Sequence, residues 1–330
     1  MDRPLRIIFF GTPQFAVPSL RALLGSGHSV AGVVTQPDKP RGRGQHVTES
    51  PVKQLAREHG IPVLQPDRLK DESALAALRE LAPDLGVVAA YGKILPAGVL
   101  ATPLLGLVNV HASLLPRHRG AAPVHRAVMA GDSVTGISIM QVVQALDAGP
   151  VYRTATRPIG PDETSADVER DLAHIGAGLL LEVIGVIASG LASPEPQDDE
   201  ASTYAPRLQK EEGTIDWSAS SQVIHNRVRG LQPWPLAWTW LGGRRLIVLK
   251  TRIGAATSAT GQESLSGVNV AAAGTILGIS RDALTVRTGD GVIDVLLVQP
   301  EGRRAMSVKD FAAGHHLTAG TRFDDGPAVT

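Results

Sequence analysis

The chain has 330 residues and carries 32 Lys and Arg against 32 Asp and Glu, so its formal net charge at pH 7 is zero. This balance excludes a histone-like polycation and argues against indiscriminate nucleic-acid binding, because phosphate binding usually needs an excess of basic residues. The chain holds no cysteine, which excludes disulfides, thiolate metal sites and cysteine nucleophiles. Its length is typical of about two domains.

The first 190 residues alternate short apolar runs with helical patterns. Ser50 followed by Pro51 is typical of a helix N-terminus, because Ser caps the first turn and Pro fits the first helical position. We expect strands over residues 5–10, 30–35, 62–64, 85–90, 107–110, 135–143 and 151–156, and helices over 15–24, 51–60, 72–81, 124–130 and 164–189. Such alternation predicts an α/β fold with a Rossmann-like, doubly wound and mainly parallel sheet.

The composition changes after residue 190. Residues 191–206 are rich in Pro and acidic residues, which is typical of an interdomain linker. We then expect a helix over 221–229, strands over 236–241, 244–253, 274–279, 283–287 and 292–298, and a loop over 255–273. Short strands at this spacing predict a smaller, mostly β barrel of oligonucleotide-binding type. The expected domains are therefore 1–190 and 207–330, joined by the linker 191–206.

The N-terminus carries only a four-residue apolar run, Ile7 to Phe10. A secretory signal needs about 7–15 apolar residues and a membrane-spanning helix about 20. We find neither pattern in the sequence, and we expect a soluble cytoplasmic protein without membrane association.

The sequence lacks the common cofactor and hydrolase motifs. Gly11-Thr12-Pro13 follows the first expected strand, where a dinucleotide-binding enzyme carries G-x-G-x-x-G. Two of the three glycines are missing, which argues against a nicotinamide cofactor. The P-loop, H-E-x-x-H and G-x-S-x-G patterns are absent as well, so the sequence does not favour a P-loop NTPase, a zincin or a serine hydrolase.

Polar residues gather most densely after the strand expected at 107–110. Asn109 and His111 are two residues apart, so their side chains leave the same face of that strand. An amide donor beside an imidazole suits the stabilisation of an oxyanion and the transfer of a proton. Asp147 is the best candidate for a carboxylate that orients the histidine. The alternatives are a structural histidine and an aspartate that only forms a turn.

Three strings of the first domain resemble a known family. NVHASLLPRHRGAAP, which begins at Asn109, resembles the active-site segment of formyltransferases that use 10-formyltetrahydrofolate. RIIFFGTPQFAVPSL and GISIMQVVQALDAGP resemble two further blocks of the methionyl-tRNA branch of this family. YAPRLQKEEGTIDW, LQPWPLAW and TGDG resemble its C-terminal portion, so the similarity covers nearly the whole chain.

The resemblance implies both a site and a reaction. It implies that Asn109, His111 and Asp147 are the catalytic residues and that a loop holds the folate, formed by Ser113, Leu114, Leu115 and Pro116. The implied reaction transfers the formyl group of 10-formyltetrahydrofolate to the α-amine of methionine on initiator tRNA. It passes through a tetrahedral intermediate, requires no metal ion and is carried out by a monomer.

Three other functions stay open at this point. Glycinamide ribonucleotide formyltransferase resembles only the first domain. Enzymes that formylate a sugar-nucleotide amine share the SLLP-x-x-RG loop and are the closer alternative. A tRNA-binding module without catalysis would leave the string at Asn109 without a purpose.

A basic loop at residues 36–50 is the first expected tRNA contact. It contains Lys39, Arg41 and Arg43, and Arg43 between two glycines matches a key arginine of the family. The family often continues with lysines, where this chain has Gln45 and His46. The alternative is a solvated surface loop.

The barrel carries the second expected tRNA contact. Residues 217–262 hold 6 basic and 0 acidic residues, and we assign four of them to phosphate contact, namely Arg227, Arg229, Arg244 and Arg245. We interpret the neighbouring Trp234, Trp238 and Trp240 as structural, because tryptophan is more often buried than presented to bases.

The zero net charge is the sum over segments whose own net charges differ in sign. Residues 131–200 hold 3 basic and 12 acidic residues, whereas residues 1–130 hold 15 basic and 9 acidic residues. No acidic residue occurs from Leu85 to Gly131, the stretch that contains Asn109 and His111. Neutrality therefore still permits a local track for a polyanion.

Overall fold

The computed structural model describes residues 4–41, 46–254 and 271–324; for residues 39–41, 46 and 47 it describes the backbone alone. The chain folds into two compact units, each assembled from separate stretches. Unit 1 comprises Met1–Val124, Val134–Pro158 and Val168–Pro206. Unit 2 comprises His125–Ser133, Ile159–Asp167 and Arg207–Thr330. The domain limits expected from the sequence stay a prediction.

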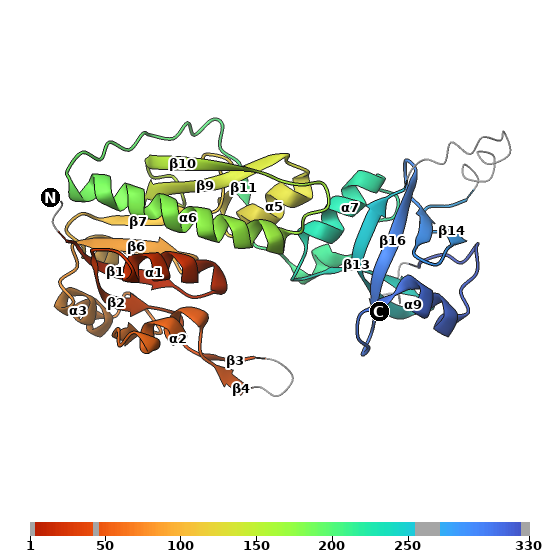
Figure 1. Ribbon diagram of the computed structural model, residues 1–330, viewed down its shortest axis with the longest axis horizontal. Coiled ribbons are helices and arrows are strands. Elements are labelled where there is room, and N and C mark those ends of the chain that lie inside the picture. The colour runs from red at the N-terminus through yellow and green to blue at the C-terminus, as the bar shows by residue number, and fades with distance from the viewer. Residues whose placement is uncertain (1–3, 42–45, 255–270, 325–330) are drawn as a thin grey trace. The chain divides into compact units, whose positions relative to one another are not determined.

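Unit 1 is built on a seven-stranded sheet in the order β10-β9-β7-β6-β1-β2-β5 (Figure 1). Its strands are β1 (Arg6–Gly11), β2 (Ser29–Val34), β5 (Val63–Leu64), β6 (Leu85–Ala89), β7 (Leu107–His111), β9 (Val134–Gln141) and β10 (Val151–Pro158). The strands from β5 to β7 are parallel, whereas β9 is antiparallel to β7, and β10 to β9. The expected mainly parallel α/β sheet is confirmed.

Helices cover both faces of this sheet. They are the short 3-10 helix η1 (Gln14–Ala16), α1 (Val17–Leu24), α2 (Pro51–Glu58), α3 (Glu72–Glu80), α4 (Ala97–Leu100) and α6 (Ser165–Ala188). Helix α5 (Pro123–Ala130) belongs to unit 2 from His125 onward. On one face, Leu107 of β7 joins a buried cluster with Leu78 of α3 and Val99 of α4. On the other face, Gly176 of α6 packs directly on Val110 of β7. The expected cap of α2 is confirmed, because the Ser50 hydroxyl accepts from the Lys53 backbone N–H at 3.2 Å.

Two pairs of short strands were not expected from the sequence. β3 (Lys39–Arg41) pairs with β4 (His46–Thr48) as a hairpin that extends from the sheet. β8 (Arg119–Gly120) pairs in parallel with β11 (Tyr204–Ala205), which lies within the expected linker. Strands this short carry no hydrophobic alternation that a sequence pattern could reveal.

Helix α6 is long and apolar enough to cross a membrane by length and composition, with a mean hydropathy of 1.7 over its most apolar window. This helix differs from the expectation, based on sequence, that no segment is long and apolar enough to span a membrane. Half of that window is buried inside the protein, and Leu172, Leu180 and Ile184 are completely inaccessible. Together with the contact at Gly176, this burial is what a core helix shows.

Unit 2 contains an antiparallel sheet in the order β12-β13-β16-β15-β14. Its elements are η2 (Lys210–Gly213), α7 (Ser221–Gly230), β12 (Ala237–Leu241), β13 (Arg244–Ile253), β14 (Ile276–Ile279), β15 (Leu284–Arg287), β16 (Val292–Pro300), β17 (Met306–Ser307) and α9 (Val308–His315). The expected antiparallel, mostly β character is confirmed. Most of the loop expected at 255–273 lies outside the described residues.

The two edge strands of this sheet are joined by the segment 320–324, which the sequence did not reveal. The backbone N–H of Ile276 in β14 donates to Thr321 O at 2.8 Å. Two residues later along the segment, Phe323 N donates to Gly274 O, and Asp324 N donates to Trp240 O of β12, each at 3.0 Å. The segment therefore supplies hydrogen bonds to both β14 and β12, which closes the sheet into a barrel.

Candidate active site

Asn109 and His111 lie at the carboxyl end of β7 and point to the same face of the sheet. Val110 between them faces α6, since it contacts Gly176. Alternation along the strand then directs Asn109 and His111 to the opposite face, which they share with Leu107. Asn109 lies between Val88 of β6 and Met140 of β9 and is partly exposed. His111 is only 5% exposed.

The two ring nitrogens of His111 have different surroundings. Nε2 lies 3.0 Å from the backbone oxygen of His118. Because a carbonyl oxygen only accepts, Nε2 carries a hydrogen and donates it. Nδ1 lies 3.7 Å from Oδ2 of Asp147, which is longer than a hydrogen bond but within ion-pair distance. Nε2 is therefore bound to the backbone, and Nδ1 is the ring nitrogen that faces a carboxylate.

Asp147 reaches His111 from the loop between β9 and β10. Its Oδ2 accepts a hydrogen bond of 2.9 Å from the Gly120 backbone N–H, and its side chain is 15% exposed. Its backbone has φ of 47°, in the left-handed region that non-glycine residues rarely occupy. Such a conformation costs about 1–3 kcal/mol and persists only where surrounding contacts hold it.

The expected folate loop, residues 113–116, is hydrogen-bonded to β9 through the hydroxyl of Ser138, and Leu114 packs on Gly136 of the same strand. Ser138 Oγ donates to Ser113 O at 2.7 Å and accepts from Leu115 N at 3.0 Å. The Ser113 hydroxyl turns inward and donates to Arg117 O at 2.6 Å. Leu114, Leu115 and Pro116 are left partly exposed. Ser113 and Ser138 therefore shape the loop, while the three residues after Ser113 can present apolar surface.

Residues 195–205, which the sequence predicts to be part of a linker, contact the loop of Asp147 and the stretch that follows His111. Gln197 donates to the backbone oxygens of Asp147 and Gly149, and Thr203 Oγ1 accepts from His118 N at 2.8 Å. These contacts belong to unit 1. An acidic, proline-rich composition predicts solvation and gives no signal for such contacts.

The β3–β4 hairpin carries the first expected tRNA contact. Lys39 and Arg41 lie in β3, opposite Thr48 and His46 of β4. Arg43 lies outside the described residues.

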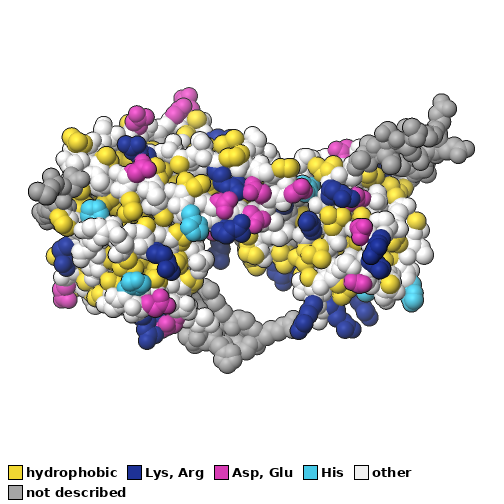
Figure 2. All heavy atoms as spheres, in the orientation of Figure 1, with side chains coloured by type: hydrophobic (Ala, Val, Ile, Leu, Met, Phe, Trp, Pro, Cys, Tyr) yellow, Lys and Arg dark blue, Asp and Glu magenta, His cyan; other side chains and the backbone are white. Residues whose placement is uncertain are grey.

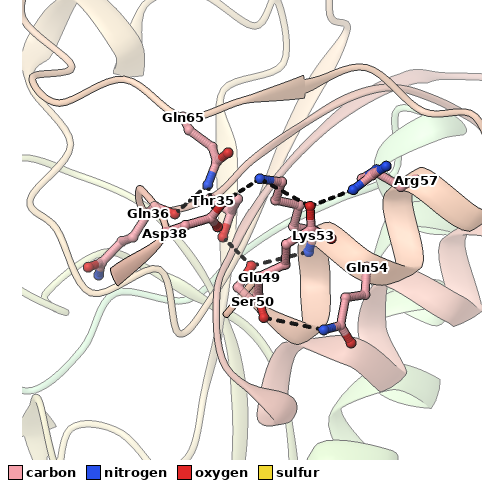
Figure 3. A network of polar contacts seen from close by, with 9 residues as sticks. All are labelled: Thr35, Gln36, Asp38, Glu49, Ser50, Lys53, Gln54, Arg57 and Gln65. Carbon is pink, nitrogen blue, oxygen red and sulfur yellow. Dashed lines mark hydrogen bonds and ion pairs between the residues drawn. The ribbon is translucent and has the colours of Figure 1, made fainter. Parts of the chain in front are cut away.

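A polar network fixes the base of this hairpin (Figure 3). Lys53 of α2 forms ion pairs with Asp38 before β3 and with Glu49 after β4, the latter at 3.4 Å. Gln65 donates to Asp38 Oδ1 at 2.9 Å, and the hydroxyls of Thr35 and Ser50 lie 2.9 Å apart. The hydrogen bond from Lys53 lowers the pKa of Asp38, and the same contact raises the pKa of Lys53. Both ends of the hairpin are thus tied to one lysine.

The barrel arginines differ sharply in accessibility, and Arg229 requires a correction. It is only 6% exposed; its Nη1 donates to the backbone oxygens of Gly160 and Glu163, and its Nε to Asn226. Burial lowers the pKa of this guanidinium. Because its donors are engaged inside unit 2, Arg229 supports the packing of this unit, and we remove it from the expected phosphate contacts.

The other three barrel arginines are at least partly accessible. Arg227 donates to Glu212 O at 2.7 Å, and Arg244 is exposed. Arg245 stacks 4.7 Å above the ring centre of Trp238, which itself packs edge-on against Trp240. Trp234 differs from these two tryptophans because it is 52% exposed.

Basic and acidic side chains are interspersed over much of the face drawn in Figure 2, as the zero net charge suggests. Lys and Arg gather at the lower edge of unit 2 in that view. Exposed basic residues that the sequence analysis did not single out include Arg303, Arg304 and Lys309. Among the described residues, no group of three or more His, Asp or Glu is placed to hold a metal ion.

Comparison with known proteins identifies the family. Residues 5–184 match the formyl transferase family model, and residues 207–316 match that of the formyl transferase C-terminal domain. The methionyl-tRNA formyltransferase of Nitrosococcus oceani is 46% identical over 321 residues, which cover 97% of this chain and 96% of that protein.

Solved structures share the fold at low identity. A sugar 3N-formyltransferase, WlaRD, superposes with a TM-score of 0.65 at 17% identity, covering 92% of this chain and all of that one. HypX from Aquifex aeolicus in complex with tetrahydrofolic acid superposes with a TM-score of 0.61 at 17% identity, covering 94% of this chain and 47% of that one. The two family models and the high identity over nearly the whole length of both chains show that this chain belongs to the methionyl-tRNA formyltransferase family.

Proposed function

We propose that the protein transfers the formyl group of 10-formyltetrahydrofolate to the α-amine of methionine esterified to initiator tRNA, giving N-formylmethionyl-tRNA for translation initiation. One observation carries the catalytic part of this proposal. In a chain of this family, β7 directs Asn109 and His111 to one face, and Asp147 meets His111 there.

The chemistry begins when the methionine amine attacks the formyl carbon and an oxyanion develops on the formyl oxygen. The Asn109 amide and a protonated Nδ1 of His111 are the proposed donors to this oxygen. One well-placed donor of this kind contributes a rate factor of about 10²–10³ in acyl transfer. These donors act most strongly where water is excluded, which fits the burial of His111.

Collapse of the intermediate breaks the bond between the formyl carbon and N10 of the folate. The amine loses a proton and N10 gains one, so the reaction is balanced without a further reactant. Asp147 is proposed to orient His111 and to assist this proton transfer. The Asp147 carboxylate and Nδ1 of His111 are 3.7 Å apart, which is close enough for the carboxylate to act on the imidazole directly.

The folate is proposed to pack against the loop of Ser113, Leu114, Leu115 and Pro116. The partial exposure of its last three residues supports this, as does the rigid anchoring of the loop by Ser138. The proposed tRNA contacts are Lys39, Arg41 and Arg43 of the hairpin and Arg227, Arg244 and Arg245 of unit 2. No metal ion takes part. The protein is proposed to act as a cytoplasmic monomer without membrane association.

A sugar-nucleotide amine is the alternative acceptor. The similarity to the sugar formyltransferase WlaRD is 17% in identity and shows the shared fold alone. The curated relatives at 42–46% identity are named methionyl-tRNA formyltransferases, which favours the tRNA acceptor.

The acceptor is tested by incubating the protein with 10-formyltetrahydrofolate labelled in its formyl group. Methionyl initiator tRNA, methionyl elongator tRNA and a sugar nucleotide with a free amine are offered separately. We expect label on the initiator tRNA far ahead of the other two acceptors. Preferential labelling of the sugar nucleotide would overturn the assignment, and labelling of no acceptor would remove the enzymatic proposal.

A further inference from the structure

The segment 195–205 hydrogen-bonds to the loop that carries Asp147 and to the stretch around Gly120, which follows His111 in the chain. At one end, Glu195 and Val151 exchange two backbone hydrogen bonds of 2.8 Å, just beyond the loop of Asp147. At the other end, β11 pairs with β8, which contains Gly120. Gly120 is the residue whose N–H binds the Asp147 carboxylate.

Gln197 joins these two loops through its side chain. Its Nε2 donates to Asp147 O at 2.8 Å and to Gly149 O at 2.7 Å. Its Oε1 accepts from Nε of Arg119 at 3.1 Å and from Nη2 of Arg119 at 2.9 Å. A side-chain amide has two donor hydrogens and two acceptor lone pairs, so every hydrogen-bonding position of Gln197 is used.

Gln197 hydrogen-bonds to the proposed catalytic residue whose backbone conformation is least favourable, Asp147. Asp147 is held in a left-handed backbone conformation, which other contacts must stabilise. Gln197 binds the carbonyl of this residue directly. It also binds Arg119, the chain neighbour of Gly120. The amide therefore holds the backbone of Asp147 directly and reaches Gly120 only through the guanidinium of the neighbouring Arg119.

We propose that Gln197 is a positioning residue for formyl transfer: it holds the backbone of Asp147 so that the carboxylate faces Nδ1 of His111. The inference rests on the proposed catalytic role of Asp147. The segment 195–205 then takes part in the reaction through Gln197 and does not only connect two parts of the chain.

Two substitutions separate the donor and acceptor roles of the amide. Gln197→Leu keeps a similar volume and removes all four hydrogen bonds. Gln197→Glu keeps oxygens for Arg119 but has no N–H for the carbonyls of Asp147 and Gly149. We expect both to lower kcat by about 10–100-fold, because a displacement of about 1 Å at a reacting group is enough for such a loss. The KM values for folate and tRNA should change much less.

Asp199→Asn is the matched control. Asp199 also binds Arg119, at 2.7 Å, but its side chain is 80% exposed, and this ion pair does not involve the Asp147 loop. An exposed ion pair of this kind contributes little, so kcat should stay at the wild-type value. Thermal unfolding of each variant checks that it is folded; if Gln197→Leu does not fold, Gln197→Glu carries the test.

A double-mutant cycle with Asp147→Asn decides the matter. Gln197 acts through Asp147. In the Asp147→Asn background, a further Gln197→Leu or Gln197→Glu substitution should therefore cause no additional loss of kcat. An equal fold-loss in both backgrounds would overturn the inference, and so would a fully active Gln197→Glu beside an impaired Gln197→Leu. An impaired Asp147→Asn with fully active Gln197 variants would overturn this inference alone. A fully active Asp147→Asn would overturn the proposed catalytic role of Asp147, and this inference with it.

Discussion

Ser138→Ala tests whether one hydroxyl holds the proposed folate loop. Ser138 lies in β9, is completely inaccessible to solvent, and binds both Ser113 O and Leu115 N. The alanine variant loses two hydrogen bonds, each contributing about 0.5–1.5 kcal/mol. It also leaves a buried carbonyl and a partly buried N–H without that partner. We therefore expect the free energy of unfolding to fall by about 1–3 kcal/mol.

The Ser138→Ala substitution should also weaken folate binding without weakening tRNA binding. Because the loop from Ser113 to Pro116 loses its anchor, the KM for 10-formyltetrahydrofolate should rise while the KM for tRNA stays near the wild-type value. Urea unfolding and steady-state kinetics with each substrate varied in turn measure the two effects.

Ser19→Ala is the matched control for this prediction. The Ser19 hydroxyl is also buried, at 1% exposure, but it has no hydrogen-bond partner among the described residues. Its removal should leave stability unchanged or slightly improved, since an unsatisfied polar group disappears. Equal destabilisation by the two variants would refute the reasoning, and so would an unchanged folate KM in Ser138→Ala.

Three further predictions concern the tRNA contacts and the core. Lys53→Met should raise the KM for tRNA and leave the KM for folate unchanged, because both ends of the β3–β4 hairpin lose an ion pair. Arg79→Met removes an exposed ion pair with Glu72 and is the control in the same kinetic assay. The KM for tRNA should rise steeply with salt concentration while that for folate barely moves, and equal salt sensitivity would contradict the phosphate contacts. Burial raises the pKa of Tyr91 to about 12. Above the pKa of about 10 in the unfolded chain, unfolding releases a proton, so wild-type stability should fall between about pH 10 and 12. Tyr91→Phe should weaken this fall, as urea unfolding across that range would show.

The repeating elements of unit 1 could be predicted because their sequence signals are local. Apolar runs such as Leu85–Ala89 mark buried strands, and Ser50 before Pro51 marks the start of α2. The shared face of Asn109 and His111 also follows from strand alternation alone. The approach of Asp147 to this face could not be worked out in that way, since it depends on how the loop after β9 returns. The residue pattern offered Asp147 only as the best candidate, with a turn-forming aspartate as the alternative, and the family resemblance favoured the catalytic role.

Other features depend on contacts between distant segments and leave no local signal. The positive charge of the Arg229 guanidinium does not decide its role. Its burial against the backbone oxygens of Gly160 and Glu163 does, and these two residues lie more than sixty positions earlier in the chain. Gln197 lies in a composition that predicts solvation, yet its amide is fully bonded. Closure of the barrel by residues 320–324 likewise depends on the pairing of Thr321 and Asp324 with separate strands.

The most direct test of the central claim is the single-turnover rate of formyl transfer by His111→Asn on methionyl initiator tRNA. The substitution keeps a polar side chain at the end of β7 but removes the nitrogen that faces Asp147. If His111 stabilises the oxyanion and moves the proton, the rate should fall by about 10²-fold or more, while thermal unfolding shows that the variant is still folded at the assay temperature. A folded variant that transfers the formyl group at the wild-type rate would contradict the account.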